Sequence, residues 1–331
     1  MDLQRRCLGI GSVMIVAAVI LRLLSAGAWQ TIGAALESAE SAAFMLYLET
    51  GRVVHPQQPA LLTETVPTTL PPVTTAPTEP AAAPPDVPCF VPADAALVDV
   101  RYHASYRPDL QQMVTSTLQW DLCTNEPTVL ILSSHATESY DPEAEPYTAS
   151  GAYRTLDTAR NMISVGAYLA ELLEQAGIRV IHDTTLHDYP SYNDSYIASR
   201  KTVQRYLQEY PSIRLVLDLH RDATDENAAQ LDTSAMADGV ESAQLMLVVG
   251  TRQELWQSNM ALAVKLTALL EKQHPGITRP ISFRTQRFNQ DLSPGALLVE
   301  VGAAGNSRQE ALTAAKVLAD AIIALSKGAN Y

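Results

Sequence analysis

Two histidines each follow a short apolar run, and this pattern predicts a metal site. His135 ends the segment Val129-Leu-Ile-Leu-Ser-Ser-His, and His220 ends the segment Val216-Leu-Asp-Leu-His. Short continuous apolar runs are typical of buried strands in a parallel sheet, and ligands bind outside the carboxyl ends of such strands. We therefore expect the two imidazoles to meet at one edge of a sheet, where they could bind a metal ion.

A catalytic zinc ion needs a third protein ligand beside the two histidines and keeps one position for water. Glu138 lies three residues after His135 and can share a turn with it, so it is the preferred third ligand. Asp157 is the alternative, because it opens the next predicted helix near the loop that follows His135. Glu138 could also do no more than cap that turn.

Glu300 ends a third apolar run, Ala296-Leu-Leu-Val-Glu, and should emerge at the same edge of the sheet. A carboxylate there could act as the general base that takes a proton from water and returns it to a leaving nitrogen. The alternative role is an ion pair with Arg221.

Residues on either side of His220 have predicted supporting roles. Asp218 should lie on the same side of the strand as His220 and orient its imidazole. Arg221 could bind a substrate carboxylate with two hydrogen bonds, or it could form a surface ion pair with Asp222.

The polar and aromatic segment from His182 to Tyr196 predicts a loop that lines a binding groove. His182 and His187 are further candidate ligands. Asn193 or Asp194 is the expected cap of the helix that follows.

Strands and helices alternate from Thr128 onward, which predicts an α/β fold with a twisted, largely parallel sheet flanked by helices. A capping-box spacing, Ser307 to Glu310, marks the start of the last helix. The expected strands are Val129–Ser133, Arg179–Ile181, Ile213–Leu219, Gln244–Val249, Ile281–Arg284 and Ala296–Val301. The expected helices span Met162 to Ala176, Ser195 to Glu209, Gln253 to Lys272 and Arg308 to Ser326.

The amino-terminal part predicts a membrane anchor followed by a spacer. The apolar run from Leu8 to Leu24 follows Arg5 and Arg6, as in a signal-anchor that leaves the rest of the chain outside the cell membrane. The alternative is a signal peptide cleaved near Ala26-Gly-Ala. The expected division is a cytoplasmic tip and transmembrane helix in 1–29, a juxtamembrane and Pro/Thr-rich linker in 30–88, and a catalytic domain in 89–331.

Composition excludes several classes of function. The net charge of −13 opposes nucleic-acid binding, which needs a cationic face. The sequence has no Gly-rich phosphate loop, Gly-x-Ser-x-Gly elbow or His-Glu-x-x-His helix. Cys89 and Cys123 would both lie outside the membrane, either joined by a disulfide or as two unpaired buried thiols.

Four segments together resemble the stage II sporulation protein P family in order and spacing. They are Val129 to Tyr140, His182 to Tyr196, Leu215 to Ala223 and Leu298 to Gly302. The resemblance implies a zinc-dependent, membrane-anchored cell-wall hydrolase related to N-acetylmuramoyl-L-alanine amidases. Such an enzyme cuts the amide between glycan and stem peptide, and an endopeptidase activity on peptide cross-links is also attributed to the family.

The same resemblance implies roles for individual residues. His135 and His220 match the metal histidines, Glu300 matches the catalytic carboxylate, and Glu138 matches by motif. Many relatives have His-Thr-His where this chain has Ser133-Ser-His, so one histidine of the pattern is missing.

The implied setting is the sporulation septum during forespore engulfment, with peptidoglycan as substrate and engulfment proteins, including a lytic transglycosylase, as partners. Two other functions remain open at this point. One is a non-catalytic wall-binding protein with the amidase fold, and the other is a secreted metallopeptidase.

Overall fold

The structure is a computed structural model that describes residues 89–118, 121–140, 153–223 and 233–328. The predicted anchor and spacer, in residues 1–88, lie outside the described residues. Within the described part of the chain, no helix has both the length and the apolar character needed to cross a membrane.

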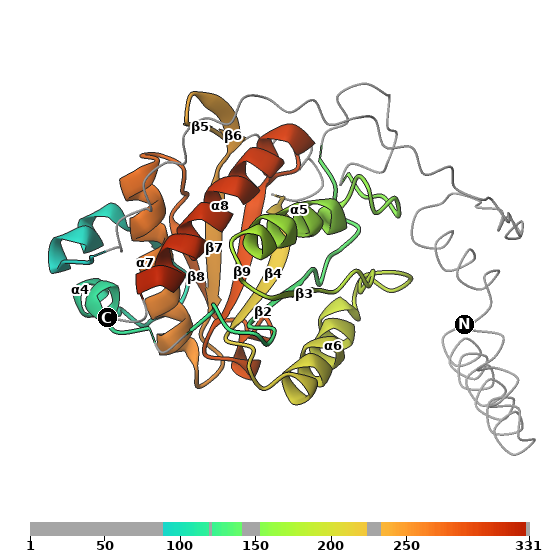
Figure 1. Ribbon diagram of the computed structural model, residues 1–331, viewed down its shortest axis with the longest axis horizontal. Coiled ribbons are helices and arrows are strands. Elements are labelled where there is room, and N and C mark those ends of the chain that lie inside the picture. The colour runs from blue at the N-terminus through green and yellow to red at the C-terminus, as the bar shows by residue number, and fades with distance from the viewer. Residues whose placement is uncertain (1–88, 119–120, 141–152, 224–232, 329–331) are drawn as a thin grey trace, which may run out of the picture. The chain divides into compact units, whose positions relative to one another are not determined.

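A seven-stranded sheet forms the centre of the fold, in the order β1-β8-β7-β9-β4-β2-β3 (Figure 1). All neighbouring strands are parallel except β7 and β9. The mostly parallel α/β sheet predicted from the sequence is therefore confirmed. The strands are β1 (Val100–Tyr102), β2 (Val129–Leu132), β3 (Val180–His182), β4 (Leu215–Asp222), β7 (Leu245–Gly250), β8 (Ile281–Arg284) and β9 (Ala296–Ala303).

Three helices cover one face of the sheet and bury the main core against it. They are α5 (Met162–Gln175), α7 (Trp256–Gln273) and α8 (Arg308–Gly328). Figure 1 shows α5 and α8 lying across this face. On the other face, α6 (Ser195–Glu209) packs over β2, β3 and β4 through the second core cluster. The part of that face over β7 and β9 carries a small apolar cluster with Phe288 and no helix among the described residues.

The six predicted strands and four predicted helices are confirmed, with ends that shift by a few residues. α5 is followed by Gly177, whose φ of 85° suits a helix end. Ser307 and Glu310 form the predicted capping box, because each side chain accepts the other's backbone N–H.

Several short elements were not predicted. They are β1, the helix α4 (Leu110–Thr115), two 3₁₀ turns (Pro92–Leu97 and Gln290–Leu292) and the hairpin of β5 (Ser234–Ala237) and β6 (Val240–Ala243). The hairpin had a signal in the sequence, since its turn residues Asp238 and Gly239 form an Asp-Gly pair with positive φ.

Cys89 and Cys123 are both free and exposed. The structure therefore has neither the disulfide nor the buried thiols that the sequence left open.

We expect Leu217→Ala to destabilise the domain by about 2–5 kcal/mol, because Leu217 is fully buried in the middle of β4. Chemical denaturation of the full chain measures the loss. Leu156→Ala removes the same atoms from a half-exposed side chain and should change stability by less than about 1 kcal/mol. Equal losses in the two variants would contradict this description of the core.

Candidate metal centre and active site

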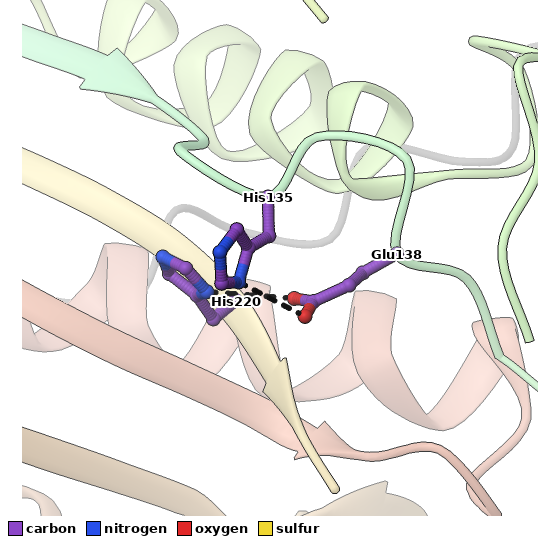
Figure 2. A group of neighbouring side chains, drawn as sticks. All are labelled: His135, Glu138 and His220. Carbon is purple, nitrogen blue, oxygen red and sulfur yellow. Dashed lines mark ion pairs between the residues drawn. The ribbon is translucent and has the colours of Figure 1, made fainter. Parts of the chain in front are cut away.

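His135 and Glu138 lie in one tight turn directly after β2. The backbone N–H of Glu138 donates to the carbonyl oxygen of His135 at 3.1 Å, which brings the two side chains to the same side. Glu138 Oε1 lies 3.4 Å from His135 Nδ1, and Glu138 Oε2 lies 3.4 Å from His220 Nδ1. Figure 2 shows the two imidazoles, one from this turn and one from β4, next to each other and both facing the carboxylate.

The structure brings together these three residues, which the sequence predicts as metal ligands, in a cluster that could hold a metal ion. One ligand atom from each residue lies within 4.8 Å of the other two, and Glu138 and His220 are buried. Two imidazole nitrogens and one carboxylate oxygen are a donor set that suits Zn²⁺ and leaves a position open. Asp157, the alternative third ligand, is exposed, accepts the backbone N–H of Ala159 and is not part of this cluster.

Asp218 fixes the orientation of His220, as predicted. Its Oδ1 lies 3.1 Å from His220 Nε2 and also accepts the backbone N–H of Ser134 at 2.7 Å. The hydroxyl of Ser134 lies 2.9 Å from the same imidazole nitrogen. With Nε2 engaged in this way, Nδ1 faces Glu138 and is the nitrogen available to a metal ion.

Burial would lower the pKa of His220, but the neighbouring Asp218, Tyr196 and Glu138 outweigh it and hold the pKa well above its ordinary value. Burial raises the pKa of Glu138, but its contacts with His135 and His220 and the charge of Arg221 bring it well below the ordinary value. The cluster therefore contains an ionised carboxylate beside a readily protonated imidazole.

Two arginines hold the segment around Glu138. Arg154 lies 3.2 Å from Glu138 Oε1 and 2.7 Å from Asp188. The backbone N–H of Arg221 donates to Glu138 Oε2 at 3.2 Å, and its buried guanidinium donates to the carbonyl oxygens of Ser139 and Tyr153. Arg221 therefore positions the chain that follows Glu138, and its predicted contact with substrate remains a prediction.

Asp222 pairs with Arg279 at 2.7 Å. The Asp222 carboxylate, which the sequence suggests as an ion-pair partner of Arg221, is therefore bound to Arg279.

Glu300 pairs with His220 in the register of β9 and β4, so its side chain lies beside the cluster. Its Oε2 is buried and has no hydrogen-bond partner among the described residues. Burial is the main cause that raises the pKa of Glu300 to about 8; the charges of Glu138 and Asp222 add to this, and those of His220 and Arg221 oppose it. A carboxyl group with a pKa near neutrality can both accept and return a proton.

The cluster opens into a groove of about 600 Å³. Tyr192 stacks on His135 with ring centroids 4.5 Å apart, and Tyr196 meets the same imidazole edge-on at 5.4 Å. The predicted loop thus lines a groove, as expected. The groove is lined by His135, Glu138, Arg154, Tyr192, Tyr196, His220, Arg221, Asp222, Ala223, Met246, Val248, Arg284, Phe288, Leu298 and Glu300.

The predicted helix cap is confirmed in position at Asp194, but the two further candidate ligands in this loop lie outside the cluster. His187 is buried away from the cluster, with Nδ1 2.9 Å from the carbonyl oxygen of Ser133 and Nε2 3.0 Å from Thr202. His182 is likewise not part of the cluster. Asp194 occupies the N-cap position of α6 but makes no side-chain capping bond.

Arg154, Phe288 and Arg284 also line the groove, and they were not predicted from the sequence. Arg154 and Phe288 had no motif around them. Arg284 is the last residue of a predicted strand, and strand alternation alone could have placed it on a face of the sheet.

The model of the family described as Stage II sporulation protein P matches residues 95–323, which is more than half of the chain. The chain belongs to the stage II sporulation protein P family. The matched range contains the cluster of His135, Glu138 and His220, together with Glu300.

Stage II sporulation protein P of Bacillus subtilis (strain 168) is 30% identical over 203 residues, which cover 58% of this chain and 49% of that protein. The chain thus spans about half the length of this relative. Among solved structures, an N-acetylmuramoyl-L-alanine amidase from Clostridium difficile 630 aligns over 60% of this chain and 96% of its own, with 15% identity and a TM-score of 0.35. That likeness is too weak to argue from.

We expect Asp218→Asn to weaken zinc binding by about 10- to 100-fold, because a neutral amide oxygen accepts the hydrogen bonds of Ser134 and His220 more weakly than a carboxylate oxygen does. Competition with a chromogenic chelator measures the affinity. Asp320→Asn, at an exposed ion pair with Lys316, is the matched control and should bind zinc like the parent chain. Unchanged affinity in Asp218→Asn would contradict the orienting role.

Zinc binding should release at least one proton per ion at pH 7. The raised pKa keeps the imidazole of His220 protonated in the metal-free chain, whereas a metal ion binds only the neutral ring. Affinity should therefore increase as pH rises toward the pKa of His220 and decrease in acid. Calorimetric titration in two buffers of different ionisation enthalpy measures the released protons, and identical heats in both buffers would overturn this expectation.

Proposed function

We propose that this chain is a membrane-anchored, zinc-dependent peptidoglycan hydrolase that cleaves the amide between glycan and stem peptide, with cleavage of peptide cross-links as a further activity. We assign it to septal wall remodelling and forespore engulfment during sporulation. The observation that carries this proposal is the His135–Glu138–His220 cluster beside Glu300, whose buried Oε2 has no hydrogen-bond partner among the described residues. Membership of a sporulation protein family supports the biological setting.

Zinc suits the donor atoms of the cluster. When bound, zinc supplies a Lewis acid that lowers the pKa of a water molecule toward ~7 and polarises an amide carbonyl. His135, Glu138 and His220 would hold the ion. Glu138 is kept ionised by its neighbours, so the cluster presents a negative ligand to a cation at neutral pH.

Glu300 would carry the proton in this reaction. In its ionised form, its buried and unpartnered Oε2 accepts the proton of the attacking water, and the carboxyl then returns it to the leaving amide nitrogen. A pKa of about 8 in the metal-free site becomes lower once a cation binds nearby, which moves the group closer to the pH of reaction.

The cellular location follows from segments outside the described residues. The apolar run from Leu8 to Leu24 would anchor the chain in the cell membrane, with the catalytic domain on the extracytoplasmic side of the sporulation septum. Peptidoglycan would be its substrate there. Other engulfment proteins, including a lytic transglycosylase, would be its partners.

Glu300→Gln should keep zinc and lose hydrolysis by about 10²- to 10⁴-fold, because the amide cannot accept the proton. His220→Ala should lose both zinc and hydrolysis. The assay incubates the full chain with purified peptidoglycan, separates the products by mass and measures zinc in the same sample. Glu254→Gln changes an exposed glutamate outside the groove and should behave like the parent chain.

The products distinguish the activities. Free stem peptides with intact glycan identify an amidase, whereas shortened cross-links identify an endopeptidase. Removal of zinc with a chelator should abolish both, and added zinc should restore them. An active Glu300→Gln variant, or a zinc-loaded parent chain that releases nothing from peptidoglycan, would contradict the proposal.

A further inference from the structure

The groove continues away from the metal cluster over the face of the sheet that α6 does not cover. Met246 and Val248 of β7 and Leu298 of β9 line it, next to Phe288. In the pairing of β7 with β9, Met246 lies opposite Glu300 and Val248 lies opposite Leu298. An apolar floor therefore leads from Glu300 toward the β8 side of the sheet.

Arg284 is the cationic residue at the far end of this floor. On β8, Ile281 and Phe283 point into the core beneath the three-helix face, so Ser282 and Arg284 face the groove. Ser282 is buried opposite Val248, and its hydroxyl accepts a hydrogen bond from Arg284 Nε at 2.9 Å. This bond orients the guanidinium of an exposed side chain.

Other charged side chains near the metal cluster are already paired. Arg154 binds Glu138 and Asp188, and Asp222 binds Arg279. The terminal nitrogens of Arg284, in contrast, have no hydrogen bond or ion pair with any residue that the structure describes. At the cluster end of the groove, the charged side chains thus form ion pairs. At the other end, Arg284 has no carboxylate partner among the described residues.

We propose that Arg284 binds a carboxylate of the stem peptide, so that the peptide half of the substrate lies along β9, β7 and β8. This inference rests on the proposed function. The two halves of the substrate differ in charge: the stem peptide carries free carboxylates, whereas in the glycan chain the lactyl carboxyl is consumed by the scissile amide. A planar guanidinium is the side chain best suited to bind a carboxylate with two hydrogen bonds.

The length of the groove agrees with a peptide of this kind. From Glu300, four residue steps of ~3.3 Å along the strands and two strand spacings of ~4.8 Å lead to Arg284, which places the two Cα atoms roughly 16 Å apart. Once the reach of the arginine side chain is subtracted, the remaining gap corresponds to about two or three peptide residues. We therefore assign the contact to the second or third residue of the stem.

The test uses two synthetic muropeptides that share the same sugar and scissile amide. In one, the free carboxylates of stem residues two and three are retained, and in the other they are primary amides. The zinc-loaded full chain should show a KM about tenfold or more lower for the carboxylate form, with similar kcat. Arg284→Gln should remove that preference, and Arg284→Lys should retain part of it.

Arg252→Ala is the matched control, because Arg252 is an exposed arginine that does not line the groove. It should keep the full preference, and all variants should keep their zinc content. A parent chain that cleaves both muropeptides with the same KM, or an Arg284→Gln variant that retains the preference, would overturn the inference while leaving the proposed function intact.

Calorimetric binding of the free stem peptide to the zinc-loaded chain gives a readout that does not depend on catalysis. The acidic peptide should bind about tenfold or more tightly than its amide form, and only in chains that have Arg284. If neither muropeptide is cleaved but this preference is observed, the proposed activity fails and the peptide site stands. If the preference is absent, the peptide site fails.

Discussion

The buried carboxylate of Asp218 joins the two chain segments that supply the side chains of the His135–Glu138–His220 cluster. It accepts the backbone N–H of Ser134, beside the His135 turn, and it also contacts the Nε2 atom of His220 on β4. A buried carboxylate is costly unless its hydrogen bonds are satisfied, so this arrangement tolerates little displacement of either segment. The positions of His135, Glu138 and His220 relative to one another depend on that constraint.

Two buried carboxyl groups near this constraint acquire opposite properties. Glu138 is surrounded by His135, His220 and Arg221, and these neighbours hold its pKa low despite burial. Glu300 has a buried oxygen that finds no partner in the described part of the chain, and burial raises its pKa to about 8. A glutamate therefore suits a metal ligand at position 138 and a proton carrier at position 300, because the hydrogen-bond donors around the two carboxyl groups differ.

The uneven covering of the sheet gives the site its shape. Three helices bury one face, while α6 covers only the strands β2, β3 and β4 on the other. The reversed direction of β7 and β8 places Met246 opposite Glu300 and directs Arg284 to the far end of the same face. An open strip of sheet beside the His135–Glu138–His220 cluster suits the peptide substrate that we propose, whereas a second helix on this face would close it.

The sequence by itself determined the strands, the main helices and the three groups His135, His220 and Glu300, because apolar runs and helical periodicity reflect burial directly. It also favoured Glu138, since a ligand three residues from His135 needs only one local turn. Only the tertiary structure decided against Asp157, gave Arg221 its backbone partners and left Arg284 facing the groove. Those outcomes depend on the order and direction of strands that are distant in the sequence, and local patterns carry no information about such pairing.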